Sequence, residues 1–206
     1  RLAQAGHRHV VVNTAWLENQ VVAQIGPVWT DPHDPILKLA ITYSMEGQDF
    51  GGALETAGGI VRALPHLAEV FWVVAGDVFA PDFSFSKHNM AALAASGDRA
   101  RLWLVPNPPH NPKGDFGLDH DRVLNMGAGD ARTRHTFSTV GLYKRSFFAP
   151  PVCELPPGNP NGERQALAPW LRHAMDLGWV SGEVFEQTWV DVGTPERLDE
   201  LRKVYG

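Results

Sequence analysis

A short apolar segment that ends in a single acid constrains the fold more than any other stretch of the sequence. Phe71–Ala75 holds five apolar residues in a row, followed by Gly76 and Asp77. Such a run is typical of a strand covered on both faces, which we expect at the centre of a sheet. Ligands of open α/β sheets bind beyond the carboxyl ends of strands. Asp77 is therefore a candidate functional residue, although aspartate at this position can also simply stabilise a turn.

Apolar strands and amphipathic helices alternate along the rest of the chain. The 206 residues predict one domain over 1–206, with an α/β fold whose front half is largely parallel. A helix over 15–25 would place Trp16, Leu17, Val21 and Ile25 on one face. The remaining predicted helices cover 59–67, 89–96, 166–178 and 195–205. The predicted strands cover 9–12, 36–44, 70–77, 100–107, 115–119, 122–126, 136–145, 180–186 and 188–193.

Composition excludes several classes of protein. The formal net charge of −5 argues against a nucleic-acid binder, which usually has a basic face. No apolar run approaches the roughly 20 residues that a membrane-spanning helix needs. Cys153 is the single cysteine, so no intrachain disulfide can form, and a reducing, cytoplasmic location is favoured. The nine histidines are scattered, which makes a zinc site improbable.

A second strand-end acid occurs near the C-terminus, in the stretch "TWVDVGTPERL". Asp191 follows a short apolar strand, and Thr194 can cap the helix that Pro195 begins. The cap needs only Thr194, so Asp191 remains free for another role. Asp77 and Asp191 could share one Mg²⁺, because this ion binds through one or two carboxylates plus substrate phosphates.

Two further stretches are candidate ligand sites. In "LETAGGI", a loop meets a helix beside Gly58 and Gly59, where exposed amides would suit a phosphate or the edge of a base. An ordinary helix start, with Glu55 near the positive end of its dipole, explains the same residues. The loop "NPPHNPKGDF", over 107–116, could contact a substrate or form a plain surface turn.

Taken together and in this order, these segments resemble the sugar-1-phosphate nucleotidyltransferases. The resemblance rests on "VVVNTAWLENQ", "LETAGGIVRALPHL", "VVAGDVF", "NPPHNPKGDFGL", "TFSTVGLY", "LAPWLRHAM" and "WVDVGTPERL", which span nearly the whole chain. It implies a Rossmann-like α/β/α fold with a mixed central sheet. It also implies transfer of a nucleotidyl group, most simply UMP from UTP, to a sugar 1-phosphate with release of pyrophosphate. The nearest branch acts on N-acetylmuramate 1-phosphate in peptidoglycan recycling.

The resemblance also implies roles for individual residues. Asp77 and Asp191 would be the Mg²⁺ ligands and catalytic residues. Glu55, Gly58 and Gly59 would line the pocket for the nucleotide base. The sugar would be bordered by three residues of the 107–116 loop, namely Asn107, Gly114 and Asp115.

The chain departs from the family pattern in three places. The family begins with a first strand and a glycine-rich, arginine-containing loop, which nothing here matches, so we expect little transferase activity from this stretch alone. Thr139 stands where the muramate branch is expected to have glycine, and Ala166 where that branch tends to have lysine. The sugar therefore stays open. A mannose-1-phosphate guanylyltransferase-like enzyme, a glycosyltransferase and a non-catalytic nucleotide- or sugar-binding domain remain alternatives.

Overall fold

The computed structural model describes residues 1–127 and 129–205. The chain divides into two compact units, each with its own sheet. The first unit consists of Arg1–Glu69, Phe85–Lys87 and Arg145–Leu171. The second unit consists of Val70–Ser84, His88–Lys144 and Arg172–Gly206.

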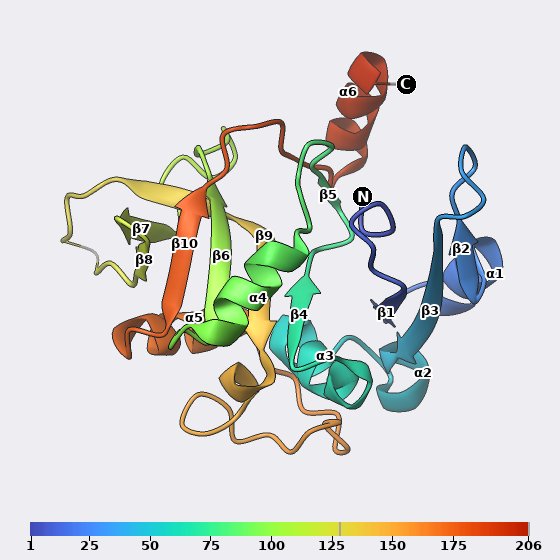
Figure 1. The fold of residues 1–206 in the computed structure, drawn as a ribbon, viewed down its shortest axis with the longest axis horizontal. Helices are drawn as coiled ribbons and strands as arrows, with labels where there is room; N and C mark the ends of the chain where they lie inside the picture. The colour runs from blue at the N-terminus through green and yellow to red at the C-terminus, as the bar shows by residue number, and fades with distance from the viewer. Residues whose placement is uncertain (128, 206) are drawn as a thin grey trace. The chain divides into compact units, whose positions relative to one another are not determined.

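The first unit is built on a three-stranded sheet with the order β1-β3-β2 (Figure 1). β1 (His9–Thr14) runs parallel to β3 (Lys38–Met45), and β2 (Val28–Thr30) runs antiparallel to β3. α1 (Glu18–Ile25) makes the crossover between the two parallel strands, as a parallel pair requires.

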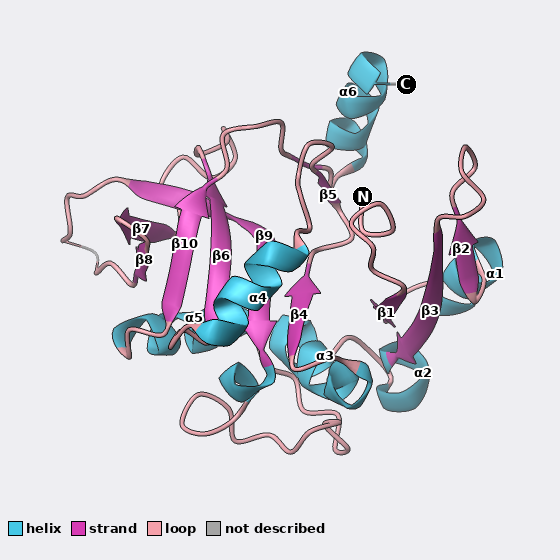
Figure 2. Ribbon diagram, viewed as in Figure 1, coloured by secondary structure: helices cyan, strands magenta, loops and turns pink. Residues whose placement is uncertain are grey.

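Two helices follow β3, and the second of them has six buried residues. α2 (Glu46–Phe50) is a short helix, and α3 (Glu55–Ala63) packs against β1 and β3. The 3₁₀ turns η1 (Leu64–His66) and η2 (Arg145–Phe148) complete the unit, and the loop after η2 contains no helix or strand until α5 (Figure 2). The large, fully buried side chains of this core include Leu54, Val61, Leu64, Phe147 and Leu171.

The second unit contains a mixed six-stranded sheet with the order β4-β9-β6-β10-β8-β7. Among the described strands of this sheet, only β6 and β10 pair in parallel, and β9 lies between β4 and β6, antiparallel to both. The strands are β4 (Val70–Val73), β6 (Ala100–Val105), β7 (Phe116–Asp119), β8 (Arg122–Leu124), β9 (Arg134–Lys144) and β10 (Val180–Val184). The mixed α/β architecture predicted from the sequence is confirmed.

A separate two-stranded ladder joins β5 (Val78–Phe79) to β11 (Val190–Asp191). α6 (Pro195–Tyr205) packs on this ladder, with the rings of Phe79 and Tyr205 centred 5.0 Å apart (Figure 1). The remaining helices are α4 (Lys87–Ala95) and α5 (Leu167–Asp176), each with residues in both units. Among the described helices, none has the length and apolar character needed to cross a lipid bilayer.

The structure corrects two predictions about the sheets. The strand that ends near Asp77 was expected at the centre of a sheet, but β4 lies at one end of the described sheet, and β9 and β6 occupy the middle. An apolar run indicates that both faces are covered, and it carries no information about the neighbouring strands. The front half is also less parallel than predicted, because β4 pairs antiparallel with β9.

The predicted helix over 15–25 is also wrong in its first turn and in its apolar face. α1 begins at Glu18, because Leu17 adopts a left-handed conformation with φ of 53°. The Trp16 side chain is 82% exposed, and α1 has no buried residue. The helical spacing of the apolar residues is real, but most of that face is exposed: Trp16, Leu17 and Ile25 face solvent, and only Val21 is half-buried.

Candidate active site

The two strand-end acids meet in the second unit. Asp77 comes immediately before β5 and Asp191 ends β11, and these two strands pair so that Asp191 lies opposite Val78. The amide of Val192 donates a hydrogen bond to the Asp77 carbonyl at 2.8 Å. The ladder therefore fixes the backbones of both acids side by side, although 114 positions separate them in the sequence.

The two carboxylates face a common point above Gly193. A Cβ placed on Gly193 would stand 3.0 Å from Asp191 Oδ1 and 3.0 Å from Asp77 Oδ2. Twice that distance is the upper limit for the separation of the two oxygens. A divalent ion that prefers oxygen ligands, such as Mg²⁺ or Ca²⁺, binds them at about 2.0–2.6 Å. Small side-chain rotations would therefore let both carboxylates bind the same ion.

Asp191 is held more firmly than Asp77. Its Oδ1 accepts the Gly193 amide at 2.8 Å, and its Oδ2 accepts Arg197 Nη1 at 2.9 Å. His110 Nε2 lies 3.4 Å from the same Oδ2. Thr194 Oγ1 accepts the Arg197 amide at 3.3 Å, which confirms the predicted cap at the start of α6. The cap thus also fixes the helix turn that carries Arg197.

Both acids line a hollow of about 260 Å³. We call it the two-aspartate hollow. Its lining residues come from β5, the 107–116 loop, β9 and the segment before β11, and they are Asp77, Val78, His110, Asn111, Thr136, Phe137, Thr139, Trp189 and Asp191. Hydroxyl, amide and imidazole groups thus surround the two carboxylates. These groups suit an anionic ligand that is rich in oxygen and binds together with a cation.

The three predicted sugar-site residues fix the 107–116 loop and do not line the hollow. Asn107 donates to the Arg134 carbonyl at 3.0 Å and accepts from Thr136 Oγ1 at 3.0 Å. Asp115 accepts the Phe137 amide at 2.8 Å. Gly114 has φ of 62°, and a Cβ on it would lie 2.7 Å from Asn107 Oδ1. These residues anchor the loop to β9, and the loop then presents its other side chains to the hollow.

Two residues of that loop reach the hollow without having been predicted. His110 and Asn111 both line it, and Asn111 Nδ2 also bonds Asp115 Oδ1 at 3.1 Å and Thr136 Oγ1 at 3.2 Å. The sequence signal was present, because both residues lie in the 107–116 loop, whose composition already marked it as a candidate ligand site. The turns of an irregular loop decide which of its side chains point inward. The residue pattern did not predict the turns of this loop.

The predicted base-site residues lie in the first unit, at the start of α3. Gly58 and Gly59 are both buried, whereas Glu55 is exposed with φ of 61°. The Gln165 carbonyl accepts the amide of Gly58 at 3.1 Å. A Cβ on Gly58 would stand 2.5 Å from the Glu163 carbonyl oxygen. Position 58 therefore requires glycine because the backbone of Glu163 packs closely against it.

Gly59 faces a buried acid. A Cβ on Gly59 would stand 2.5 Å from Glu46 Oε1 and 2.6 Å from Asn13 Nδ2. Glu46 Oε2 accepts the Leu54 amide at 2.8 Å, while Oε1 has no partner among the described residues. Burial raises the pKa of the Glu46 carboxyl above its ordinary value of 4.5, and the Leu54 hydrogen bond opposes that shift. Glu46 thus ties the turn before α3 to the end of β3.

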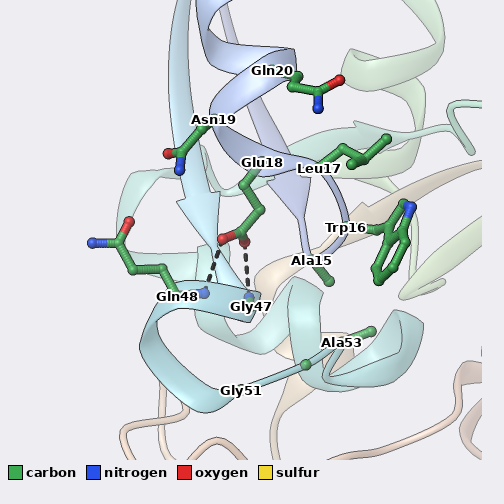
Figure 3. A pocket seen from close by; sticks show the side chains of 11 residues that line it. Ala15, Trp16, Leu17, Glu18, Asn19, Gln20, Gly47, Gln48, Gly51 and Ala53 are labelled. Carbon is green, nitrogen blue, oxygen red and sulfur yellow. Dashed lines mark hydrogen bonds between the residues drawn. The ribbon is translucent and has the colours of Figure 1, made fainter.

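A larger open hollow of about 920 Å³ lies beside this turn (Figure 3). It is lined by residues 15–20, 47–48 and 51–53. Glu18 closes one side, where its two oxygens accept the amides of Gly47 and Gln48 at 2.8 and 2.9 Å (Figure 3). Trp16 lies on the opposite side of Glu18 from Gln48, and its side chain is exposed (Figure 3). Glu55, Gly58 and Gly59 are not among the lining residues.

The donor set of the two-aspartate hollow fits a magnesium ion better than a zinc ion. Over residues 1–127 and 129–205, no group of three or more His, Cys, Asp or Glu side chains is arranged to hold a metal. Zinc sites use three or four such ligands, whereas Mg²⁺ takes one or two carboxylates and completes its shell with water and substrate phosphates. Two converging aspartates therefore meet the requirement for Mg²⁺.

A relative of known activity covers the whole chain. The chain is 39% identical over 210 residues to the N-acetylmuramate alpha-1-phosphate uridylyltransferase of Neisseria meningitidis serogroup B. The match takes in 100% of this chain and 82% of the relative. The chain belongs to the sugar-1-phosphate nucleotidyltransferase family. The resemblance predicted from the sequence motifs is thereby confirmed.

Solved structures show the same nucleotidyltransferase fold. A Bacillus anthracis protein assigned as a glucose-1-phosphate thymidylyltransferase superposes with a TM-score of 0.72 at 15% identity, over 98% of this chain and 78% of that one. HddC from Yersinia pseudotuberculosis superposes with a TM-score of 0.64 at 14% identity, over 100% of this chain and 82% of that one. The T. maritima inositol-1-phosphate CTP transferase gives 0.57 at 16% identity, over 95% and 72%. No family model matches the chain.

Proposed function

We propose that this family member transfers UMP from UTP to a sugar 1-phosphate, with N-acetylmuramate 1-phosphate as the preferred sugar, and releases pyrophosphate. The observation that carries the proposal is the convergence of Asp77 and Asp191 on the two-aspartate hollow. The activity of the meningococcal relative supports the choice of nucleotide and sugar. Such a reaction would serve the recycling of peptidoglycan sugars in the cytoplasm, where nucleoside triphosphates are available.

The reaction joins two anions. An oxygen of the sugar phosphate forms a bond to the α-phosphorus of UTP, and the bond from that phosphorus to the β-phosphate oxygen breaks. A sugar phosphate is already ionised at neutral pH, so its nucleophilic oxygen has no proton for a general base to remove. What the protein must supply is alignment of the two reactants and compensation of their charge.

We assign the holding of a Mg²⁺ ion to Asp77 and Asp191. When bound, the ion supplies positive charge to the phosphates, which lowers the cost of bringing them together. Arg197 and the Gly193 amide hold the Asp191 carboxylate in a fixed orientation. The side chains of Asn111 and Thr136 offer polar groups at the wall of the hollow. The 107–116 loop is held on β9 by Asn107 and Asp115, which keeps this wall in place.

The base-binding role of the first unit rests on the family resemblance. We propose that the turn carrying Glu55, Gly58 and Gly59 borders the nucleotide base, with the two glycines acting mainly through the backbone shape that they permit. Their packing against Glu163 and Glu46 supports a rigid turn. Specificity for uracil would then come from backbone groups of that turn.

A substrate panel tests this function. The complete natural protein is incubated with Mg²⁺, one of UTP, CTP, GTP or dTTP, and one of several sugar 1-phosphates, and pyrophosphate release is measured. We expect the highest kcat/KM for UTP with N-acetylmuramate 1-phosphate. A preference for GTP with mannose 1-phosphate would select the guanylyltransferase alternative. Nucleotide binding without any pyrophosphate release would select the non-catalytic alternative.

A further inference from the structure

A strained residue lies in the middle of the longest strand. Thr139 belongs to β9, which has 11 residues, yet its φ is 62°. β-Branched residues rarely adopt a positive φ, and those that do are concentrated at functional sites, where the surrounding structure holds them in place. Glycine would adopt the same conformation without the steric penalty.

The strain is built into a β-bulge. Leu102 of β6 pairs with Gly141 of β9, and Leu104 pairs with Phe137, so Trp103 alone faces three residues of β9, 138–140. β-Bulges redirect side chains and occur frequently beside active sites.

Hydrogen bonds hold this bulge at both ends. Ser138 Oγ donates to the Trp103 carbonyl at 2.6 Å and accepts the Val140 amide at 3.1 Å, which replaces the missing ladder bonds. The Ser138 carbonyl accepts Thr139 Oγ1 at 2.6 Å and Trp189 Nε1 at 3.0 Å. The conformation of Thr139 is thus enforced by four hydrogen bonds.

The bulge places Thr139 at the two-aspartate hollow. Ser138 and Val140 are buried, whereas Thr139 is half-buried and lines the hollow together with both aspartates. The hollow measures about 260 Å³, slightly below the roughly 300–1,000 Å³ of ordinary ligand pockets. In a space of this size, the three side-chain heavy atoms of one threonine change the shape that a ligand can have.

We propose that Thr139 is a specificity-determining residue that limits the size of the sugar 1-phosphate accepted beside the aspartates. This inference rests on the proposed function. The hydroxyl proton is already donated to the Ser138 carbonyl. What Thr139 presents to the sugar is therefore mainly its bulk, which narrows the space for sugar substituents without shutting out N-acetylmuramate, the preferred sugar of the proposed function.

Three variants separate bulk from hydrogen bonding. Thr139→Gly removes the side chain and suits the positive φ, Thr139→Val keeps the shape and removes the hydroxyl, and Thr139→Ser keeps the hydroxyl and removes the methyl. In the complete protein, kcat/KM is measured with UTP and three sugar 1-phosphates of increasing size: glucose, N-acetylglucosamine and N-acetylmuramate. Binding of the same sugar phosphates is measured by calorimetry, and thermal unfolding monitors the fold.

We expect Thr139→Gly to raise kcat/KM for the largest sugar relative to the smallest by about 10-fold, the usual effect of one to two methylene-sized groups in a pocket. Thr139→Val should keep the wild-type ratio within about 2-fold, and Thr139→Ser should fall between Gly and Val. The inference is overturned if the ratio of kcat/KM for the largest sugar to that for the smallest is unchanged in Thr139→Gly. It is also overturned if Thr139→Val changes this ratio as much as Thr139→Gly does. A wild-type protein that is inactive with every sugar overturns the proposed function and this inference together.

Discussion

The carboxylates of Asp77 and Asp191 both lie beside Gly193, each with one oxygen 3.0 Å from the point where a Cβ on that glycine would stand. The β5–β11 ladder and the bond from the Val192 amide to the Asp77 carbonyl fix this relationship in the backbone. The absence of a side chain at position 193 leaves the space between the two acids open. The chemistry proposed for the chain depends on that space.

Filling that space should weaken binding at the proposed Mg²⁺ site. In Gly193→Ala the new methyl would crowd both carboxylates at 3.0 Å, so they would turn away from the shared position. We expect the Mg²⁺ concentration for half-maximal pyrophosphate release to rise by roughly 10-fold, equivalent to about 1.4 kcal/mol, with thermal stability little changed. Gly97→Ala is the matched control, because nothing lies within 4 Å of its Cβ. If pyrophosphate release depended on Mg²⁺ concentration equally in both variants, the space between the two carboxylates would not be where Mg²⁺ binds.

Gly58 offers a test of whether the glycine pair is structural. A Cβ on Gly58 would stand 2.5 Å from the Glu163 carbonyl oxygen, so the backbone must shift. We expect Gly58→Ala to destabilise the protein by about 1–3 kcal/mol in urea unfolding, in spite of the higher helix propensity of alanine. Gly97→Ala again serves as the control. A Gly58→Ala protein of wild-type stability that has lost UTP affinity would instead assign Gly58 directly to the ligand.

The buried carboxyl of Glu46 should make stability depend on pH. Its pKa is raised above 4.5 in the folded chain, chiefly by burial. The contribution of this carboxyl to the free energy of unfolding is therefore fully present below pH 4.5, and it is lost as the pH rises through the raised pKa. Glu46→Gln carries no ionisable group and keeps an acceptor for the Leu54 amide. We expect the two proteins to be similar in stability near pH 4 and the variant to gain relative to wild type toward pH 7.

Urea unfolding at a series of pH values checks this expectation. Glu186→Gln, a change at an exposed glutamate, is the control and should follow the wild-type profile. A Glu46→Gln profile parallel to wild type over the whole range would contradict a raised pKa.

The bulge in β9 should depend on one hydroxyl. Ser138 Oγ bonds both the Trp103 carbonyl and the Val140 amide, and the side chain is buried. Ser138→Ala leaves these two groups without partners, which costs about 1–3 kcal/mol. We expect a loss of that size in thermal or urea unfolding, together with a reduced kcat/KM, because Thr139 is no longer held at the hollow. A variant as stable as wild type would mean that the bulge is held without Ser138.

The sequence predicted the parts of this protein that follow from local pattern. The acid Asp191 at the end of β11, the Thr194 cap and the strands predicted over 115–119 and 122–126 are set by residues adjacent in the chain, and all occur in the structure. The strand predicted over 70–77 stops at Val73, so Asp77 precedes β5 and does not end β4. That Asp77 and Asp191 could share one ion was inferred from their positions after apolar runs, and the family resemblance implied the same. The β5–β11 ladder that brings them together could not be predicted, because it has too few residues to give a periodic signal.

Other features could not be read from the residues. The apolar run of β4 did not reveal its neighbours in the sheet, and the helical spacing of Trp16 with α1 did not reveal that this face is uncovered. The positive φ of Thr139 arises from the register between β6 and β9, which are far apart in sequence. Each of these depends on tertiary pairing, which overrides local propensity.

The most direct test of the central claim is divalent-ion binding by aspartate variants of the complete protein. Mn²⁺, used as a spectroscopic substitute for Mg²⁺, is titrated in the presence of UTP into wild type, Asp77→Asn, Asp191→Asn and the double variant. If the two carboxylates share one ion, each single variant should lose roughly 100-fold in Mn²⁺ affinity, and the double variant should be little worse than either. Wild-type Mn²⁺ affinity in either single variant would contradict the account.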